Sequence, residues 1–278
     1  MLKFILQYTN SGVCQKGKTT SDMSISENND PSREAYIGMN QLQIKRPPLM
    51  DFTGTEAVNS ICANILYSGH DLKTILLTSC VASEGKSTMA ARLLLQCANR
   101  GLKTVYVDLD LRKSEVAGKL GLKTAGRLRG LAHYLAGCIE LEEVIYKTNL
   151  ANVYIAPAGR TVPNPIPLIN SPAFGVLFDR LKAEFDMIIV DTPPVGLVID
   201  AADISRVCDG SVIVIEYGKR HRGEVQRAVR QMAKTSTPVL GCIIDKVTVN
   251  SISEKKYYKT RYYGAGYENK TSGKSSSR

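Results

Sequence analysis

Apolar residues in this chain form short, nearly continuous runs that alternate with segments of helical periodicity. A strand that is apolar on both sides is buried on both faces, and right-handed helical crossovers between such strands give a doubly wound, mostly parallel sheet. The runs rich in Val and Ile predict strands at Thr74–Thr78, Thr104–Leu109, Asn152–Ala156, Met187–Asp191, Ser211–Glu216 and Val239–Asp245. Helical spacing predicts helices near Thr55–Leu66, Ser87–Arg100, Glu140–Tyr146, Pro172–Phe185, Asp200–Cys208 and Arg222–Thr235. We therefore expect a single α/β domain.

Polar segments flank the alternating region. Residues 1–50 are rich in Ser, Thr, Asn and Asp, which predicts a poorly ordered N-terminal arm. Residues 51–250 contain all the expected strands and helices, and a chain of 278 residues that is 44% hydrophobic is long enough for one such core. Residues 251–278 have no apolar periodicity and predict a flexible, basic, tyrosine-rich tail.

The segment Thr78–Thr88 (Thr-Ser-Cys-Val-Ala-Ser-Glu-Gly-Lys-Ser-Thr) joins an expected strand to an expected helix. In such a turn, successive backbone N–H groups surround phosphate oxygens, the lysine adds positive charge, and the following hydroxyl can bind Mg²⁺. The pattern predicts a P-loop NTPase-type fold in which Lys86 contacts phosphate and Ser87 binds the metal. The expected nucleotide-binding residues of the loop are Ser83, Glu84, Gly85, Lys86, Ser87 and Thr88. The alternative is a chance Gly-Lys-Ser at the start of a helix.

The loop has only one glycine in its turn. Cys80 and Ser83 stand where such loops usually have glycine or small, flexible residues. A non-glycine residue at positive φ costs on the order of 1 kcal/mol, which a bound triphosphate could offset.

Two of the expected strands end in acidic residues. Asp108 and Asp110 lie two positions apart, hence on one face of an extended segment, and Asp191 ends another strand. The carboxyl ends of parallel strands meet at one edge of the sheet, and a buried acid costs several kcal/mol unless it meets a cation. We therefore expect Mg²⁺ bound by Ser87, Asp110 and Asp191, with one carboxylate left to handle a proton. The alternative for Asp110 is an ion pair with Arg112 or a helix cap.

Charge and cysteine content indicate the kind of partner and the cellular compartment of the protein. The formal net charge is +10, and residues 255–278 contain seven Lys or Arg against one acid, which indicates an anionic partner. The seven cysteines are scattered without a C-x-x-C pair, so neither a disulfide framework nor a zinc site is expected, and a reducing cytoplasm fits best. No apolar run approaches the eighteen residues of a membrane span.

Tyrosines are concentrated near the C-terminus. Five of the 13 tyrosines fall within residues 257–267, interleaved with cations. This arrangement fits base stacking on single-stranded nucleic acid, contact with a lipid interface, or acceptance of phosphate by tyrosine hydroxyls. A plain disordered terminus is the remaining alternative.

In combination, these segments resemble the bacterial tyrosine kinases of the capsular and exopolysaccharide biosynthesis family, in particular the separate cytoplasmic kinases that work with a membrane adaptor. The similarity covers roughly residues 55–267. The segments that carry it are 83–87 (Ser-Glu-Gly-Lys-Ser), 108–112 (Asp-Leu-Asp-Leu-Arg), 130–137, 157–159 with 163–165, 185–194 and the tyrosine cluster.

The resemblance implies an ATP-dependent and Mg²⁺-dependent protein-tyrosine kinase that phosphorylates its own tail and other proteins and regulates polysaccharide synthesis and export. It assigns Asp108, Asp110 and Lys86 to catalysis and makes Asp191 the Walker B acid. The implied phosphoacceptors are Tyr257, Tyr258, Tyr262, Tyr263 and Tyr267. The implied partners are a membrane adaptor of the polysaccharide co-polymerase type, further copies of the chain and a cognate tyrosine phosphatase. Nucleic acid is not expected, and the implied location is the cytoplasm, at the inner face of the cell membrane.

Three features depart from the family pattern. The family usually has Pro-Gly where this chain has Ala82-Ser83, a difference expected to weaken nucleotide affinity. The subunit-contact motif of the family has two arginines after its glutamate, whereas Glu56 is followed by Asn59 and Cys62. Asp245 stands where an asparagine usually reads the adenine edge, and a carboxylate can only accept hydrogen bonds. The alternative is that Asp245 is a solvated acid at the end of its strand, paired with Lys246. Two rival functions stay open, a partition or septum-positioning ATPase and a nucleotide-sensing adaptor with a degraded site.

Overall fold

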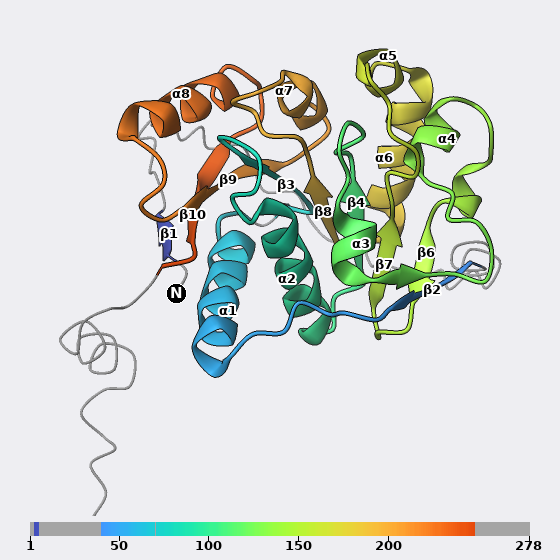
Figure 1. Ribbon diagram of the computed structural model, residues 1–278, viewed down its shortest axis with the longest axis horizontal. Coiled ribbons are helices and arrows are strands. Elements are labelled where there is room, and N and C mark those ends of the chain that lie inside the picture. Colours follow the sequence, from blue (N-terminus) through green and yellow to red (C-terminus); the bar gives the residue numbers. More distant parts are fainter. Residues whose placement is uncertain (1–2, 6–39, 70, 248–278) are drawn as a thin grey trace, which may run out of the picture.

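The computed structural model describes residues 3–5, 40–69 and 71–247. Within them the chain forms one mixed sheet, whose strands lie in the order β1-β10-β9-β3-β8-β4-β7-β6-β2-β5 (Figure 1). The strands are β1 Lys3–Ile5, β2 Gln41–Ile44, β3 Thr74–Ser79, β4 Thr104–Asp108, β5 Leu122–Lys123, β6 Tyr146–Thr148, β7 Val153–Ala156, β8 Met187–Asp191, β9 Gly210–Glu216 and β10 Val239–Asp245. The helices are α1 Phe52–Tyr67, α2 Lys86–Asn99, α3 Val116–Leu120, α4 Leu131–Leu135, α5 Ile166–Ile169, α6 Pro172–Glu184, α7 Asp200–Ser205 and α8 Arg222–Met232.

The centre of the sheet is parallel, and the antiparallel pairs lie toward its margins. Strands β10, β9, β3, β8, β4 and β7 pair in parallel in that order, and so do β6 and β2. The antiparallel pairs are β1 with β10, β6 with β7, and β2 with β5. This confirms the predicted doubly wound, mostly parallel α/β sheet. Because β8 lies between β3 and β4, the loop after β3 and the acids that end β4 and β8 reach the same edge of the sheet.

Helices cover both faces of the sheet (Figure 1). One face packs against α1, α2 and α3, whose buried side chains include Ile61, Leu93 and Leu120. The other face packs against α4, α6, α7 and α8, with Phe178 and Met232 among the buried residues. All six residues of β3 are buried, as expected for a central strand covered on both faces. No helix in the described ranges is long and apolar enough to cross a membrane.

The expected N-terminal arm is too long at its C-terminal end. Gln41–Ile44 form strand β2, which pairs with β6 and buries Leu42 and Ile44 while the two glutamines stay exposed. This alternation with a period of two is the pattern of a half-buried strand, and it is visible in the sequence. Residues 6–39 of the arm and 248–278 of the expected tail lie outside the described residues.

The helix predicted at Glu140–Tyr146 is wrong. The structure has a short 3₁₀ helix at Leu141–Glu143 and then strand β6, which starts at Tyr146. The run is too short for a stable helix, and the β-branched Val144 and Ile145, both fully buried, favour an extended chain that can join the sheet.

Candidate nucleotide-binding and catalytic site

The loop between β3 and α2 adopts two left-handed backbone conformations. Ser83 has φ +67° and Gly85 has φ +92°. At Gly85 a side chain is also excluded by space, because a Cβ atom there would lie 2.1 Å from Oδ2 of Asp245. At Ser83 the conformation carries the expected strain, on the order of 1 kcal/mol. The loop therefore forms the predicted turn, with the strain at the position that lacks glycine.

Glu84 anchors this loop through its side chain. The residue is 1% exposed. Its carboxylate accepts hydrogen bonds from the backbone N–H of Val81 and from Nε of Arg220, both at 2.9 Å. Arg220 precedes α8, so the ion pair fastens the loop to the β9–α8 connection. The Glu84 side chain is thus engaged away from phosphate, and a contact of Glu84 with nucleotide would use its backbone.

Lys246 holds the loop from the end of β10. Its Nζ donates to the carbonyl oxygen of Ser83 at 3.1 Å and to Oε2 of Glu216 at 2.9 Å. The expected alternative, an ion pair between Asp245 and Lys246, is therefore not what the structure shows. Asp245 is buried, faces Gly85 and lies 3.9 Å from Nη1 of Arg92. Its predicted role in reading the base stays a prediction.

Lys86 stands at the centre of the acidic residues. Its Nζ lies 2.5 Å from Oδ1 of Asp191, 3.7 Å from Oδ2 of Asp110 and 3.4 Å from Oγ of Ser87. Lys86 is 7% exposed and Asp191 is fully buried. The structure thus brings together the side chains that the strand ends and the loop predicted. The one lysine faces more negative charge than it can neutralise.

Asp108 is the acid whose pKa responds most to this excess negative charge and to burial. It lies opposite Asp191 in the β4–β8 register, and it accepts hydrogen bonds from the Ser114 hydroxyl and from the backbone N–H of Asp110. Burial, followed by the nearby charge of Asp191, raises the pKa of Asp108 to about 7. Burial likewise raises the pKa of Asp110, although Lys86 opposes the shift. A carboxylate whose pKa lies near neutrality can accept and release a proton at physiological pH.

Several residues of the site escaped the sequence reasoning. Tyr106 donates its hydroxyl to Oδ2 of Asp191 at 2.7 Å, and burial with the charge of Asp191 raises its pKa well above the usual value. Nothing in the apolar run of β4 distinguishes this tyrosine from a core residue. Ser114 follows Asp108 by six residues in the loop after β4, whereas Arg220 and Lys246 come from loops distant in sequence from their partners in the phosphate loop. No sequence pattern marked these contacts.

Arg112 belongs to the support of the site. Its Nε and Nη2 donate to the buried carboxylate of Asp200 at 2.7 and 3.0 Å. The alternative in which Arg112 pairs with Asp110 is therefore wrong. Asp110 instead accepts from the backbone N–H of Lys113 at 3.0 Å, which leaves its other oxygen facing Lys86.

A cavity of about 310 Å³ adjoins the C-terminal end of the loop. Ser87 and Thr88 line it together with Pro47, Pro48 and Lys119. The space lies between the N-terminus of α2, the segment after β2, and α3. The residue predicted to bind the metal, Ser87, therefore borders open space.

The expected subunit-contact positions differ in exposure. Asn59 is partly exposed and donates to Oε1 of Glu56 at 3.1 Å. Cys62 is 1% exposed, and its Sγ lies 3.3 Å from Sγ of Cys97 on α2. Position 62 therefore packs inside the domain and is closed to a neighbouring subunit. The five expected acceptor tyrosines lie outside the described residues.

The sheet order, the loop at the start of α2 and the acids at the neighbouring strand ends define a nucleotide-binding domain of the P-loop class. In agreement, the model of the AAA domain family matches residues 73–236. More than half of the chain is covered, so the chain belongs to this class of domain.

Comparison with known proteins narrows the class. Tyrosine-protein kinase CpsD of Streptococcus agalactiae serotype Ia is 38% identical over 211 residues, covering 76% of this chain and 90% of CpsD. Tyrosine-protein kinase YwqD of Bacillus subtilis is 32% identical over 209 residues, covering 74% and 87%. The crystal structure of the chimerical protein CapA2B2 matches with a TM-score of 0.67 at 27% identity, over 80% of this chain and 99% of that one. The chain belongs to the family of bacterial tyrosine-protein kinases of capsular and exopolysaccharide biosynthesis, as its motifs predicted.

Proposed function

We propose that this tyrosine kinase transfers the γ-phosphate of ATP to tyrosines of its own C-terminal segment, and that this modification regulates capsular or exopolysaccharide synthesis and export. The convergence of Lys86 with Asp191 and Asp110 beside the phosphate loop is the observation that supports the proposal most strongly. The proposed acceptors are Tyr257, Tyr258, Tyr262, Tyr263 and Tyr267.

The acidic residues fit a magnesium ion. Burial and the neighbouring carboxylates raise the pKa values of Asp108 and Asp110, and Lys86 opposes the shift. Lys86 alone does not balance the negative charge of these acids. In residues 3–5, 40–69 and 71–247, no three acidic, His or Cys side chains converge enough to hold a metal unaided. Mg²⁺ keeps several waters and takes few protein ligands, so Ser87, Asp110 and Asp191 suit it together with phosphate. When bound, Mg²⁺ would neutralise charge on the transferring phosphoryl group.

The protein side chains supply positioning and charge. The ammonium of Lys86 would turn from Asp191 to the phosphate oxygens, and the loop N–H groups would hold the same oxygens. The tyrosine oxygen then bonds to the γ-phosphorus, the bond from that phosphorus to the bridging oxygen breaks, and ADP leaves. Asp108 accepts the phenol proton, since a tyrosine with a pKa near 10 is not ionised at neutral pH.

The same proposal includes the setting of the reaction. A membrane adaptor of the polysaccharide co-polymerase type would recruit the chain to the inner face of the membrane. Other copies of the chain would present their tails to the site, and a cognate tyrosine phosphatase would reverse the modification. The resemblance described above supports these partners.

The test uses the full chain, ATP and Mg²⁺, with the cytoplasmic part of the adaptor if labelling requires it, and maps phosphotyrosine by mass spectrometry. We expect phosphate within residues 257–267. Lys86→Met should abolish labelling, whereas Lys113→Met, which changes an exposed lysine of a neighbouring loop, should preserve it. Asp108→Asn should bind nucleotide and lose transfer.

Other outcomes would redirect the assignment. Consumption of ATP without tail phosphotyrosine would favour a switch ATPase. Nucleotide binding without either reaction would favour a nucleotide-sensing adaptor. Continued labelling of Lys86→Met would refute the role of the loop.

A further inference from the structure

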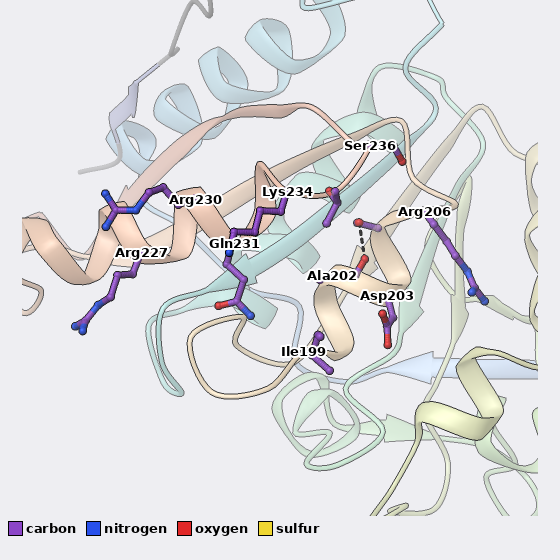
Figure 2. Close-up of a pocket in the computed structure, with 11 residues that line it drawn as sticks. Ile199, Ala202, Asp203, Arg206, Arg227, Arg230, Gln231, Lys234 and Ser236 are labelled. Atoms are coloured by element: carbon purple, nitrogen blue, oxygen red, sulfur yellow. Dashed lines mark hydrogen bonds between the residues drawn. The ribbon is translucent and has the colours of Figure 1, made fainter.

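A groove of about 770 Å³ lies between α7 and α8, and the described nucleotide site contributes none of its lining. Figure 2 shows that Gln231 points across it toward Ile199, whereas the head groups of Arg227 and Arg230 extend from α8 away from α7 and Arg206 extends away at the opposite end, so the cations lie at the rim of the groove. Both helices follow segments that reach the catalytic edge, since α7 comes after Asp191 and α8 comes after Arg220. The groove is therefore a surface separate from the nucleotide site, and the chain segments that precede α7 and α8 link the two.

The groove is strongly cationic. Arg227 and Arg230 lie on α8 and Lys234 lies on the turn that follows it, and all three are exposed. Within the described part of the chain, none of these three side chains makes an ion pair or a hydrogen bond. Lys234 and the two arginines thus have charge available for a ligand. The one acid in the lining is Asp203, against four cations including Arg206.

Arg206 is already fixed in place. It donates to Oδ1 of Asn170 at 2.7 Å and to the carbonyl oxygen of Ile169 at 2.6 Å, and its guanidinium lies 5.5 Å from the ring centre of Phe174. It therefore marks the far side of the groove as a rigid positive end. The three unpaired cations lie on α8 and on the turn that follows it.

The lining also includes apolar surface. Ile199 is 58% exposed, and Ala202 lies on the adjoining turn of α7. An aromatic ring could cover this apolar part while a phosphate group at the rim of the groove meets a guanidinium group. Arginine favours phosphate because its planar fork can donate two parallel hydrogen bonds. A phosphorylated tyrosine combines the two features that the groove complements.

We propose that this groove binds the phosphorylated form of the chain's own segment 254–268. The inference rests on the proposed function, which supplies the phosphates. Before modification the segment contains four Lys or Arg and two Glu, a net charge of +2, so the cationic groove repels it. Five phosphates add roughly −8 to −10, which makes the segment about −6 to −8 and reverses the sign of the interaction.

The segment can reach the groove within one molecule. The described chain ends at Val247, next to Lys246, which is held at the end of β9 by Glu216. The ten residues from 247 to 257 can span up to about 33 Å when extended. Helix α8, which follows β9 through a short connection, is only about 16 Å long for its 11 residues. No rearrangement of the domain is required.

A lipid surface is the main competing ligand, because anionic head groups also attract exposed cations. The concave shape of the groove and its rigid Arg206 end favour a peptide over a flat bilayer. The experiment therefore includes both ligands.

The test measures binding of a synthetic, dye-labelled peptide of residues 254–268 to the full, unphosphorylated chain by fluorescence anisotropy at about 0.15 M salt. The peptide is used with five phosphotyrosines and with none. The groove variant combines Arg227→Gln, Arg230→Gln and Lys234→Gln. The control variant removes the same charge at three exposed positions elsewhere, Lys123→Gln, Lys147→Gln and Arg160→Gln.

We expect the phosphorylated peptide to bind at least tenfold more tightly than the unmodified peptide. The groove variant should lose at least tenfold in affinity and the control variant less than threefold. Equal losses in the two variants, or equal affinity for the two peptides, would overturn the proposal. Charge-dependent binding to phosphatidylserine vesicles through Arg227, Arg230 and Lys234, without peptide binding, would also overturn it in favour of a lipid surface.

Because the phosphates are introduced chemically, this result is independent of the kinase reaction. Failure of peptide binding leaves the proposed autophosphorylation intact. Failure of autophosphorylation with successful peptide binding would keep the groove as a phosphotyrosine site and remove only its proposed source.

Discussion

Arg220→Met tests whether the contact between Glu84 and Arg220 prepares the phosphate loop for nucleotide. The substitution removes the one cation bonded to a carboxylate that is 1% exposed. Methionine retains much of the length and apolar surface of arginine, so the loss of charge and hydrogen bonding is the main change. Glu84 keeps its hydrogen bond from Val81 but is left as a buried charge without a partner.

The expected cost follows from the geometry. Breaking a buried ion pair by removing one partner costs about 3–5 kcal/mol. Arg220 is 25% exposed, however, so water can partly replace it, and a charged hydrogen bond of this kind contributes about 1.5–3 kcal/mol. We therefore expect a loss of about 2 kcal/mol. If the whole loss falls on the ordering of the loop, ATP affinity declines roughly thirtyfold.

Two measurements divide that cost between folding and binding. Thermal unfolding reports the part that destabilises the domain, for which about 2 kcal/mol lowers the melting temperature by roughly 4–8 °C. Titration calorimetry with ATP and Mg²⁺ reports the part that the nucleotide must restore. The matched control is Arg222→Met, two positions along the chain, because Arg222 is exposed and its change should stay within about 0.5 kcal/mol.

The double variant Glu84→Gln, Arg220→Met tests whether the unpaired carboxylate of Glu84 causes the loss. It removes the buried charge as well as its partner, so it should be more stable than Arg220→Met alone. If the double variant is equally or more impaired, the unpaired carboxylate is not the cause. If Arg220→Met binds ATP with unchanged affinity and melts normally, the contact has no part in preparing the loop.

Three further predictions concern single positions. In metal-free protein, burial raises the pKa of Asp108 from an ordinary 3.8 to about 7. The folded state therefore holds this proton at pH values where the unfolded chain has lost it, and stability falls as pH rises from about 4 to 7. Asp108→Asn should gain stability relative to the wild type across that range, on the order of 1–3 kcal/mol, and the same pH dependence of the unfolding free energy for both proteins in EDTA would contradict this. Asp245→Asn removes a carboxylate that faces Gly85, so calorimetry should show ATP and GTP binding tightened alike by about threefold to tenfold, whereas a changed ratio would make Asp245 a reader of the base. Cys62→Arg, which restores the family's contact residue, should destabilise the domain by about 3 kcal/mol or more because position 62 is buried against Cys97, and normal denaturant unfolding would show that α1 can turn this position outward.

The parallel core of the fold was predictable because its signal is local. Strands buried on both faces must be apolar throughout, and β3, β4, β8, β9 and β10 all show such runs. The margins of the sheet were harder. β6 is three residues long and pairs with β7 and β2, and it begins at Tyr146, the last residue of the segment for which helical spacing predicted a helix. Tertiary pairing, which no local pattern encodes, decides short segments of this kind.

The candidate site divides in the same way. Lys86, Asp108 and Asp191 were predictable because a strand–turn–helix segment with Gly-Lys-Ser and acid-ended parallel strands must meet at one edge of the sheet. Tyr106 and Arg220 were not, since the first looks like a core residue and the second like a surface charge until its partner is known. Residues that support a site reach it from any part of the chain, so only the folded structure identifies them.

The support residues also explain how this loop forms with so few glycines. Ser83 is strained, but its carbonyl oxygen is held by Lys246, and the next residue, Glu84, is bonded to Arg220. Each contact holds the turn in its conformation through a neighbouring side chain, at a point where glycine would adopt that conformation through its own backbone freedom. Lys246 also precedes the tyrosine segment and Arg220 also precedes α8. If the tail is phosphorylated and binds along α8 as proposed, it would act through Arg220 on the turn that we expect to bind phosphate. The residues that compensate for missing glycine would then couple the loop to the product of the proposed reaction.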